Sequence, residues 1–269
     1  MTDRYAVIGN PIAHSKSPLI HGMFAEQTGQ RISYEAIAAP LDGFAATIAR
    51  LRAEGYKGCN VTVPFKFEAY ALATELTPRA RAAQAVNTLK FDGATILGDN
   101  TDGAGLVRDI EHNIGVLLEK KRVLLMGAGG ASFGVVLPLL TTYAQLTVVN
   151  RTVGKAQQLA ATFAAHAHIA GLGYNDLQGQ HFDVVINATS TGLSDELAPL
   201  PDDIFASPAL AYDMMYGRDT PFLRFARAHG AQTADGLGML VEQAAEAFYL
   251  WRGVRPDTTP VMAALHLQK

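Results

Sequence analysis

The feature that most constrains the fold is a run of 28 residues, from Val123 to Asn150, that contains no Asp, Glu, Lys or Arg. A helix of that length is long enough to span a bilayer, since an α-helix rises about 1.5 Å per residue. However, glycines at positions 127, 129, 130 and 134 and a proline at 138 divide the run into short apolar segments. A buried β-α-β unit accounts for this pattern better than one spanning helix does.

The turn of this β-α-β unit is rich in glycine and opens the helix. An apolar strand over 122–126 leads into Gly127, Ala128, Gly129, Gly130, Ala131 and Ser132. Glycines in such a turn let the backbone approach a pyrophosphate, and the helix N-terminus supplies N–H groups and the positive end of a dipole. Ser132, a small residue, replaces the third glycine of the usual fingerprint. The pattern predicts a dinucleotide site; the alternative is a glycine turn without a ligand.

The end of the next strand indicates which dinucleotide is bound. A site for NAD usually has Asp or Glu about 20 residues after the glycines, where the carboxylate accepts from the ribose 2′-hydroxyl. Here the strand over 146–149 ends at Asn150, Arg151 and Thr152, with Lys155 close behind and no carboxylate. A guanidinium, a hydroxyl and an ammonium suit a 2′-phosphate. We therefore expect NADP(H); the alternative is that Arg151 and Lys155 are solvated residues at a helix start.

Charge and cysteine content narrow the class of protein. The 269 residues include 22 Lys and Arg against 25 Asp and Glu, a formal net charge of −3. A mildly acidic chain without a basic run predicts no nucleic-acid partner. A single cysteine, Cys59, excludes an internal disulfide and a cysteine-based zinc site, and His14, His21 and His112 lack the spacing of metal ligands. With no signal-peptide pattern after Met1, we expect a cytoplasmic protein without a membrane segment.

Strand patterns and helical patterns alternate along the whole chain, which is typical of an α/β protein. We expect two α/β lobes with a cleft between them. Residues 1–101 together with 238–269 would form the first lobe. Residues 102–237 would form the second, a doubly wound dinucleotide-binding lobe of the Rossmann type with further buried strands over 182–187 and 210–214. A helix over 103–114 would bridge the lobes, and one over 238–251 would return the chain to the first lobe.

Local signals predict several elements of the first lobe. Ser17 followed by Pro18 predicts a helix in which Ser17 is the N-cap and Pro18 the first helical residue. The stretch 65–76 predicts one helix, and residues 87–97 predict a hairpin around Asp92-Gly93. Asp102 is expected to cap the helix that follows it.

Three polar clusters of the first lobe can carry chemistry. They are Ser15 with Ser17, Asn60 and Thr62 with Lys66, and Asn87 with Asp99, Asn100, Thr101 and Asp102. Hydroxyls ahead of a helix N-terminus suit a carboxylate, amides suit alcohol groups, and a Lys/Asp pair suits the protonation of an alkoxide formed by hydride transfer. Each cluster alone has an ordinary structural explanation as a cap or a surface residue. Together they would suit a polyhydroxylated acid.

These motifs, in this order, resemble the shikimate dehydrogenase family, which reduces 3-dehydroshikimate to shikimate with NADPH in aromatic amino-acid biosynthesis. The resemblance covers nearly the whole chain. Beside the nucleotide motifs it rests on residues 8–18 (IGNPIAHSKSP), 58–66 (GCNVTVPFK), 85–88 (AVNT), 98–103 (GDNTDG), 187–192 (NATSTG), 212–216 (YDMMY) and 234–245 (ADGLGMLVEQAA).

The resemblance implies roles for individual residues. Lys66 and Asp102 would be the catalytic pair. The substrate carboxylate would be held by Ser15, Ser17 and Tyr216, and the ring oxygens by Thr62, Asn87, Asp102 and Gln243. The adenosine phosphate would be surrounded by Asn150, Arg151, Thr152 and Lys155, of which Lys155 replaces an arginine that is frequent in the family. The nicotinamide side would be lined by Thr189, Met214, Gly236 and Met239.

Two rival functions stay open, beside that of a structural subunit, which the intact polar cleft argues against. One is a quinate/shikimate dehydrogenase of the same family that also uses NAD, which the missing carboxylate at 150–152 argues against. The other is a non-catalytic NADPH-binding sensor, which the presence of both Lys66 and Asp102 argues against. The sequence leaves the choice between a monomer and a homodimer open.

Overall fold

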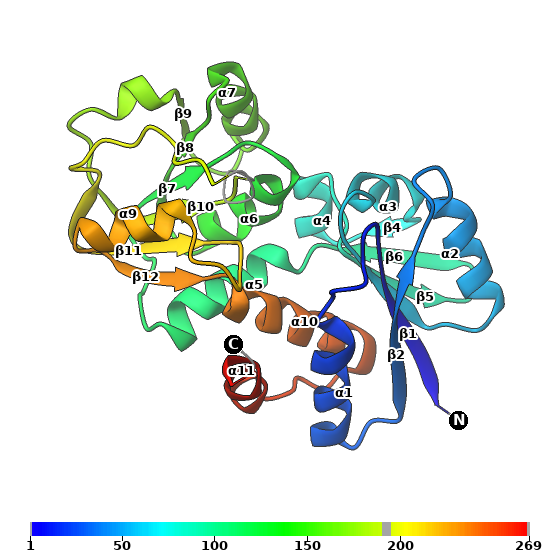
Figure 1. Ribbon diagram of the computed structural model, residues 1–269. Coiled ribbons are helices and arrows are strands. Elements are labelled where there is room, and N and C mark those ends of the chain that lie inside the picture. The colour runs from blue at the N-terminus through cyan, green and yellow to red at the C-terminus, as the bar shows by residue number, and fades with distance from the viewer. Residues whose placement is uncertain (1, 190–194, 268–269) are drawn as a thin grey trace. The chain divides into compact units, whose positions relative to one another are not determined.

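The computed structural model describes residues 2–189 and 195–267. The chain divides into two compact units, which we call unit 1 (Met1–Gly105 with Leu240–Lys269) and unit 2 (Leu106–Met239). Figure 1 labels their helices and strands. Both division points fall within helices, α5 (Asp102–Arg108) and α10 (Leu237–Arg252). They lie a few residues from the boundaries expected from the sequence.

Unit 1 is built on a mixed sheet. Across the sheet its described strands lie in the order β2 (Ile32–Ala38), β1 (Asp3–Gly9), β3 (Gly58–Val61), β5 (Thr88–Asp92), β6 (Thr95–Asp99) and β4 (Glu75–Leu76). β1 pairs in parallel with β2 and β3, whereas β5 is antiparallel to both β3 and β6. The helices are α1 (Ser17–Thr28), α2 (Phe44–Ala53), α3 (Lys66–Leu72), α4 (Pro78–Ala83) and α11 (Thr259–His266), with most of α10 and the start of α5.

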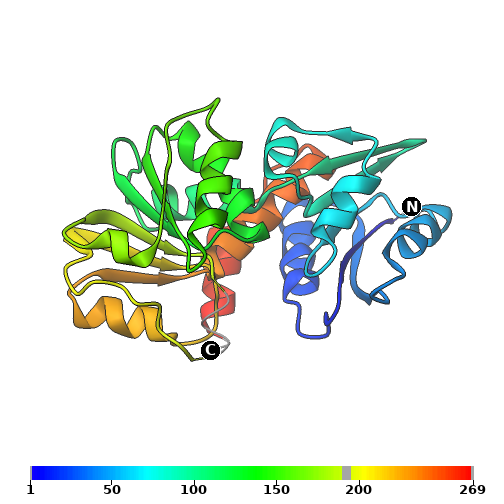
Figure 2. The ribbon, with the colours of Figure 1, turned by 90° about the horizontal axis from the view of Figure 1, so that it is seen from above.

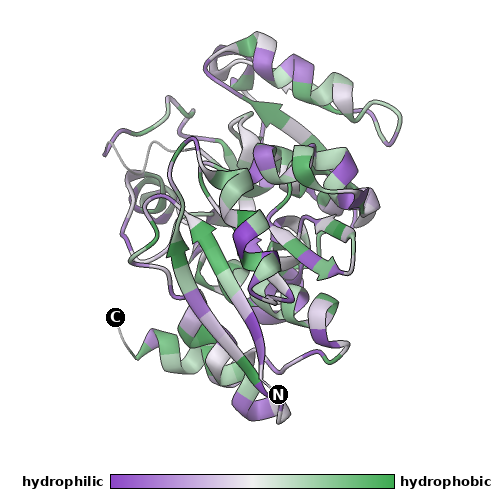
Figure 3. Cartoon of the chain, turned by 90° about the vertical axis from the view of Figure 1, so that its right-hand side faces the viewer, coloured by the Kyte–Doolittle hydropathy of each residue, from purple (hydrophilic) through white to green (hydrophobic). Residues whose placement is uncertain are grey.

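The core of unit 1 forms where hydrophobic strand residues meet α2 and α3. Strand β1 changes from hydrophilic at its start to hydrophobic at its end, which the hydropathy colours show just after the N-terminus (Figure 3). Ile8, Phe44, Phe65 and Leu89 are buried together in one cluster. Burying a side chain of this size stabilises the fold by about 1.5–3 kcal/mol. The cluster therefore holds the end of β3 and the start of α3 in place, where several candidate site residues lie.

Unit 2 is built on a parallel sheet. Its described strands lie in the order β12 (Gln232–Asp235), β11 (Phe205–Asp213), β10 (Phe182–Asn187), β7 (Arg122–Met126), β8 (Gln145–Val149) and β9 (Ala170–Leu172). The remaining elements are α6 (Gly130–Thr141), α7 (Val153–Thr162), a 3-10 turn over Tyr174–Leu177 and α9 (Pro221–Ala228). α9 lies on the opposite face of the sheet from α6 and α7 (Figures 1 and 2). This is the doubly wound order of the Rossmann fold, so the predicted α/β class and Rossmann-type sheet are confirmed.

The uncharged run over 123–150 is the first β-α-β unit of this sheet. It forms β7, α6 and β8, and β7 pairs in parallel with β8 on one side and β10 on the other. Val123, Leu125, Val136 and Val148 are fully buried, which explains why the run carries no charge. Across residues 2–189 and 195–267, no helix combines the length and apolar character that a membrane span needs.

Four local predictions were wrong, and two of them concern α1 and α3. α1 begins one residue earlier than expected, so Lys16 is at the N-cap position and Ser17 is the first helical residue. The helix predicted over 65–76 ends at Leu72, because residues 75–76 pair with β6 as the edge strand β4.

The helix predicted over 103–114 is shorter and irregular. α5 begins at Asp102 itself, and a π-helical turn follows over Asp109–Asn113. Asp102 is therefore not a cap. Its N–H donates to the side-chain oxygen of Asn100 at 3.2 Å.

Candidate active site

A lysine and an aspartate meet in unit 1. Lys66 is the first residue of α3, and Asp102 is the first residue of α5. Lys66 Nζ donates to Asp102 Oδ2 at 2.5 Å, and the two side chains are 23% and 12% exposed. Partial burial strengthens such a pair, while the remaining exposure leaves both groups accessible to a ligand. The structure thus brings together the two residues that the sequence singled out for proton transfer.

Asn87 aligns the aspartate. Its side-chain oxygen accepts from the backbone N–H of Thr101 at 2.9 Å, which fixes the orientation of the amide. Its Nδ2 donates to Asp102 Oδ1 at 2.8 Å and to Thr101 Oγ1 at 3.0 Å. Each oxygen of the Asp102 carboxylate therefore has a donor, Asn87 on one side and Lys66 on the other.

Gln243 reaches the same cluster from α10. Its Oε1 lies 3.4 Å from both Asn87 Nδ2 and Thr101 Oγ1, and its Nε2 donates to the backbone oxygen of Leu240. An ionic network holds α10 here: Arg79 pairs with Asp99, next to the loop of Thr101, and with Glu246 at 3.0 Å. Gln243 is therefore held beside Asn87.

The other candidate ligands of unit 1 lie in separate positions. Ser15 Oγ accepts from the N–H of Ser17 at 3.3 Å just ahead of α1, and Ser17 is 7% exposed. Thr62 follows β3 and packs against Gly9, where an added Cβ would lie 2.5 Å from its methyl group. Among the described residues, none of these three hydroxyls hydrogen-bonds to the Lys66–Asp102 pair. The hydroxyls are thus left for other partners.

The glycine loop of unit 2 fits a pyrophosphate. Gly127 follows β7 with φ +103°, and a Cβ there would lie 3.2–3.3 Å from Ala188 and Thr189, beyond the end of β10. The gap between β7 and β10 is the point where the strand order reverses, at which α/β folds bind nucleotides. Gly129 is the N-cap of α6 without a side-chain cap, and space beside it is open. Ser132 Oγ is buried and has no partner among the described residues. Unpaired donors at this position suit an anionic cofactor.

The residues after β8 form an exposed basic turn. Asn150 Nδ2 donates to the backbone oxygen of Thr152 at 3.0 Å, and α7 begins after Thr152 without a side-chain cap. Arg151 and Lys155 are both exposed. Burial raises the pKa of Tyr174 to about 12, against the opposing charge of Arg151. The donor set of this turn fits a 2′-phosphate and offers nothing to repel one.

Three of the residues expected on the nicotinamide side lie where the strands of the unit 2 sheet end. Thr189, Met214 and Gly236 follow the carboxyl ends of β10, β11 and β12. A Cβ on Gly236 would lie 2.3 Å from the backbone oxygen of Met214, so only glycine fits there. Met239 is 8% exposed and donates its N–H to Tyr212 Oη at 3.3 Å. Ser190, Thr191 and Gly192 of the 187–192 motif lie outside the described residues.

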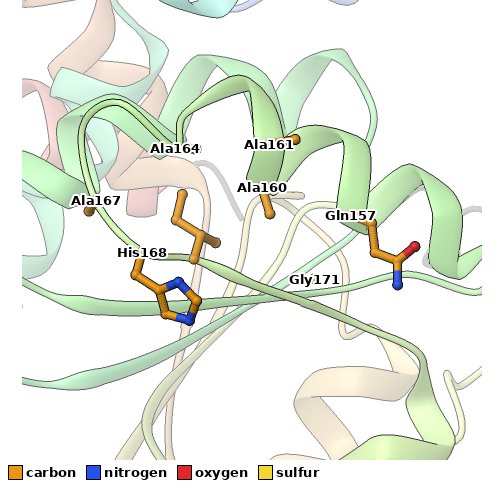
Figure 4. A pocket seen from close by; sticks show the side chains of 8 residues that line it. Gln157, Ala160, Ala161, Ala164, Ala167, His168 and Gly171 are labelled. Atoms are coloured by element: carbon orange, nitrogen blue, oxygen red, sulfur yellow. The ribbon is translucent and has the colours of Figure 1, made fainter.

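Two further features complete the description of unit 2. Tyr216 follows β11, and its pKa is raised by burial. A hollow of about 370 Å³ is lined largely by alanines of α7 and of the segment that follows it, together with Gln157 and His168 (Figure 4). It lies away from the glycine loop and lacks the polar groups that a nucleotide or a polyhydroxylated acid requires.

Within the part of the chain that the structure describes, no cluster of His, Cys, Asp and Glu could hold a metal ion.

Two features define the class of this protein. One is a Rossmann-type sheet with an open glycine loop, and the other is a Lys/Asp pair in a second α/β unit. Together they define a dinucleotide-dependent oxidoreductase. Family models agree. "Shikimate dehydrogenase substrate binding domain" matches residues 7–89, "Shikimate / quinate 5-dehydrogenase" matches residues 109–194, and "Shikimate 5'-dehydrogenase C-terminal domain" matches residues 236–266.

Relatives that match nearly the whole chain agree with the family models. A "Shikimate dehydrogenase (NADP(+))" from Methylobacillus flagellatus is 63% identical over 266 residues, 98% of each chain. The solved structure of an Ael1 enzyme from Pseudomonas putida has a TM-score of 0.94 at 50% identity over 98% of each chain. Shikimate 5-dehydrogenase from Thermus thermophilus, in complex with NADP(H) and shikimate, has a TM-score of 0.87 at 34% identity over 98% of each chain. The chain belongs to the shikimate dehydrogenase family.

Sequence reasoning missed Tyr34 and Thr88, which connect the candidate residues of unit 1. Tyr34 Oη donates to Asn60 Oδ1 at 2.7 Å, and Asn60 Nδ2 donates to Thr88 Oγ1 at 3.0 Å. Their connection depends on the pairing of β3 with β5, in which Asn60 lies opposite Thr88. No local signal in the sequence reveals that register.

Proposed function

We propose that this chain is an NADP-dependent shikimate dehydrogenase, which interconverts 3-dehydroshikimate and shikimate in aromatic amino-acid biosynthesis. The observation that carries the proposal is the Lys66–Asp102 pair, 2.5 Å apart and aligned by Asn87. The names of whole-length relatives support both the substrate and the cofactor. We assign substrate binding and catalysis to unit 1 and NADP binding to unit 2.

The proposed chemistry divides between the cofactor and the protein. Oxidation of shikimate removes a hydride from carbon and a proton from the attached hydroxyl; NADP⁺, when bound, would supply the hydride acceptor. In the reductive direction the Lys66 ammonium stabilises the negative charge that develops on the ketone oxygen and donates a proton to it. Asp102 holds that ammonium in place, and in the oxidative direction the same pair receives the proton. Such assistance is worth about 10²–10⁴-fold in rate.

Substrate groups are assigned to the remaining polar side chains. The carboxylate is assigned to Ser15, Ser17 and Tyr216, and the ring oxygens to Thr62, Asn87, Asp102 and Gln243. Two facts support this assignment. Asn87 and Gln243 lie beside the Lys66–Asp102 pair, so a ring bound there places a hydroxyl at Lys66. Ser15 and Ser17 stand at the N-terminus of α1, where the helix dipole favours an anion.

Cofactor groups are assigned to the ends of the unit 2 strands. The pyrophosphate is assigned to the loop of Gly127, Gly129, Gly130, Ala131 and Ser132. The 2′-phosphate is assigned to Asn150, Arg151, Thr152 and Lys155, and the nicotinamide to Thr189, Met214, Gly236 and Met239. Support comes from the uncapped start of α6 and from the exposed basic turn after β8.

Absorbance at 340 nm with purified protein tests the proposal. Shikimate and quinate are each offered with NADP⁺ and with NAD⁺. Fast reduction with shikimate and NADP⁺ alone is expected. Turnover with quinate or with NAD⁺ would move the chain to the broader quinate/shikimate dehydrogenases. No turnover, with NADPH still bound, would favour the non-catalytic sensor.

We further propose a cytoplasmic location and either a monomer or a homodimer. The single cysteine, Cys59, is buried and free, which is compatible with a reducing compartment. Light scattering during size-exclusion chromatography distinguishes a mass near 28.7 kDa from twice that value. A larger assembly would contradict the proposal.

A further inference from the structure

A continuous line of hydrogen bonds runs from the aromatic interior of unit 1 to the Lys66–Asp102 pair. Tyr34 Oη donates to Asn60 Oδ1 (2.7 Å), and Asn60 Nδ2 donates to Thr88 Oγ1 (3.0 Å). Thr88 Oγ1 donates to Asn87 Oδ1 (2.9 Å), and Asn87 Nδ2 donates to Asp102 Oδ1 (2.8 Å). We call Tyr34, Asn60, Thr88 and Asn87 the positioning chain. Thr88 is fully buried, and Asn60 and Asn87 are 6% and 3% exposed.

Backbone groups set the direction of every bond in the positioning chain. Asn60 Nδ2 also faces the backbone oxygen of Asn87 at 3.3 Å, and a carbonyl oxygen can only accept. Asn60 Oδ1 must therefore turn to Tyr34 as its donor. At the other end, the backbone N–H of Thr101 can only donate, and its acceptor is Asn87 Oδ1. This bond fixes the orientation of the Asn87 amide, so Asn87 Nδ2 points to Asp102. The hydroxyl of Thr88 is the one group of the chain that must accept and donate at once.

We propose that Tyr34 and Thr88 are positioning residues, which act on the reaction by holding the amides of Asn60 and Asn87 in the orientation that aligns Asp102 with Lys66. This inference rests on the proposed function, because it assigns proton transfer to that pair. Neither residue touches the pair itself. Without the Thr88 hydroxyl, Asn87 loses one of its donors and Asn60 loses an acceptor, in a setting where water cannot replace them.

The surroundings of Tyr34 support a role for its hydroxyl beyond packing. Its ring stacks on His21 with centroids 4.2 Å apart, so the ring alone satisfies the aromatic packing. Burial, and to a lesser extent Cys59, raises the pKa of Tyr34 well above its usual value, against an opposing effect of Ser17. The hydroxyl therefore keeps its proton and serves as the donor that Asn60 Oδ1 needs.

The test uses pairs of variants that separate the hydroxyl from the shape of the side chain. Thr88→Val keeps the shape and removes the hydroxyl, whereas Thr88→Ser keeps the hydroxyl. Tyr34→Phe removes a hydroxyl from the positioning chain. Tyr5→Phe removes one from the same aromatic cluster, since Tyr5 stacks on Trp251 at 4.6 Å and has no bond to Asn60. For each variant we measure kcat, the KM for shikimate, the Kd for NADPH and the unfolding midpoint.

We expect Thr88→Val and Tyr34→Phe to lower kcat about tenfold or more with NADPH affinity unchanged. Thr88→Ser and Tyr5→Phe are expected to stay within about twofold of the original kcat, even where they lower the unfolding midpoint. Equal effects of Thr88→Val and Thr88→Ser, or of Tyr34→Phe and Tyr5→Phe, would overturn the proposal, as would an unchanged kcat in Thr88→Val.

A second readout does not require turnover. In protein labelled with ¹⁵N-asparagine, Thr88→Val should shift the side-chain amide signals of Asn60 and Asn87 and speed their hydrogen exchange, while Tyr5→Phe leaves them in place. Lack of shikimate oxidation in the unmodified chain would reject the proposed function alone. Unmoved amide signals in Thr88→Val would reject the positioning chain alone.

Discussion

Stability at acid pH should depend on one buried histidine. His21 lies in α1 with no exposed surface, between Tyr34, Phe24 and Trp251, whose ring centroids are 4.2, 5.9 and 5.4 Å away. Burial lowers the pKa of His21 to about 3, against a weaker opposing effect of Asn60. The folded protein thus keeps this ring neutral where an unfolded chain would protonate it.

The size of the effect follows from the two pKa values. The unfolded histidine titrates near pH 6.5, so between pH 6.5 and pH 3 the unfolded state binds one more proton than the folded state. The contribution of the neutral His21 ring to the free energy of unfolding is fully present above pH 6.5. It is lost as the pH falls, by up to about 1.4 kcal/mol per pH unit. Between pH 7 and pH 4.5 the loss amounts to about 2.5 kcal/mol. His21→Phe removes the titration and keeps an aromatic ring, so this part of the loss should vanish.

The assay is urea unfolding from pH 7 to pH 4.5, followed by the fluorescence of Trp251. This residue is the single tryptophan of the chain and packs beside His21, so it reports on unit 1 itself. His14→Gln, at an exposed position, is the matched control and should lose as much stability as the unmodified protein. Equal acid losses in the unmodified protein and in His21→Phe would refute the reasoning.

Two further substitutions test other parts of the molecule. Arg151→Ala should raise the KM for NADPH at least about tenfold more than the KM for NADH, because the guanidinium would contact the 2′-phosphate, which NADH lacks. Equal effects on both KM values in steady-state assays would contradict the assignment of the 2′-phosphate to this turn. Gly58→Ala should lower the unfolding free energy by about 1–3 kcal/mol, because its Cβ would lie 2.4 Å from the Leu89 oxygen and 2.7 Å from Trp251 Nε1. Gly22→Ala, where nothing lies within 4 Å of the new Cβ, is the control for urea unfolding and should be neutral or stabilising.

Strands buried on both faces were the easiest elements to predict. β7 and β10 have the bounds expected from the sequence, because a central parallel strand reads as a continuous apolar run. Edge strands carry no such signal. Glu75–Leu76 and Ala170–Leu172 form β4 and β9 only because a neighbouring strand offers free backbone groups, which no local pattern shows.

Some missed helices did have a signal. Thr77-Pro78 and Thr220-Pro221 open α4 and α9, and in each the threonine side chain accepts from the backbone N–H three residues later. A threonine followed by proline is a helix start that the sequence does contain. At Ser17-Pro18 a similar pair misplaces the cap by one residue, since the chain is already helical at Ser17.

The candidate site was predictable as a list of residues and less so as an arrangement. Lys66, Asn87 and Asp102 were expected to act together, and the structure does bring them into contact. The role first expected for Asp102, a helix cap, was wrong, because Asp102 is itself the first helical residue. Thr88 could not be recognised, because its place between two amides follows from the register of β3 and β5 rather than from its neighbours in sequence.

The central claim is that Lys66 transfers the proton to and from shikimate. The most direct measurement is the steady-state oxidation of shikimate by NADP⁺ at 340 nm with the unmodified chain and with Lys66→Ala. We expect kcat to fall by about 10²-fold or more with little change in the KM for shikimate. A large rise in KM with kcat unchanged would contradict the claim and limit Lys66 to substrate binding.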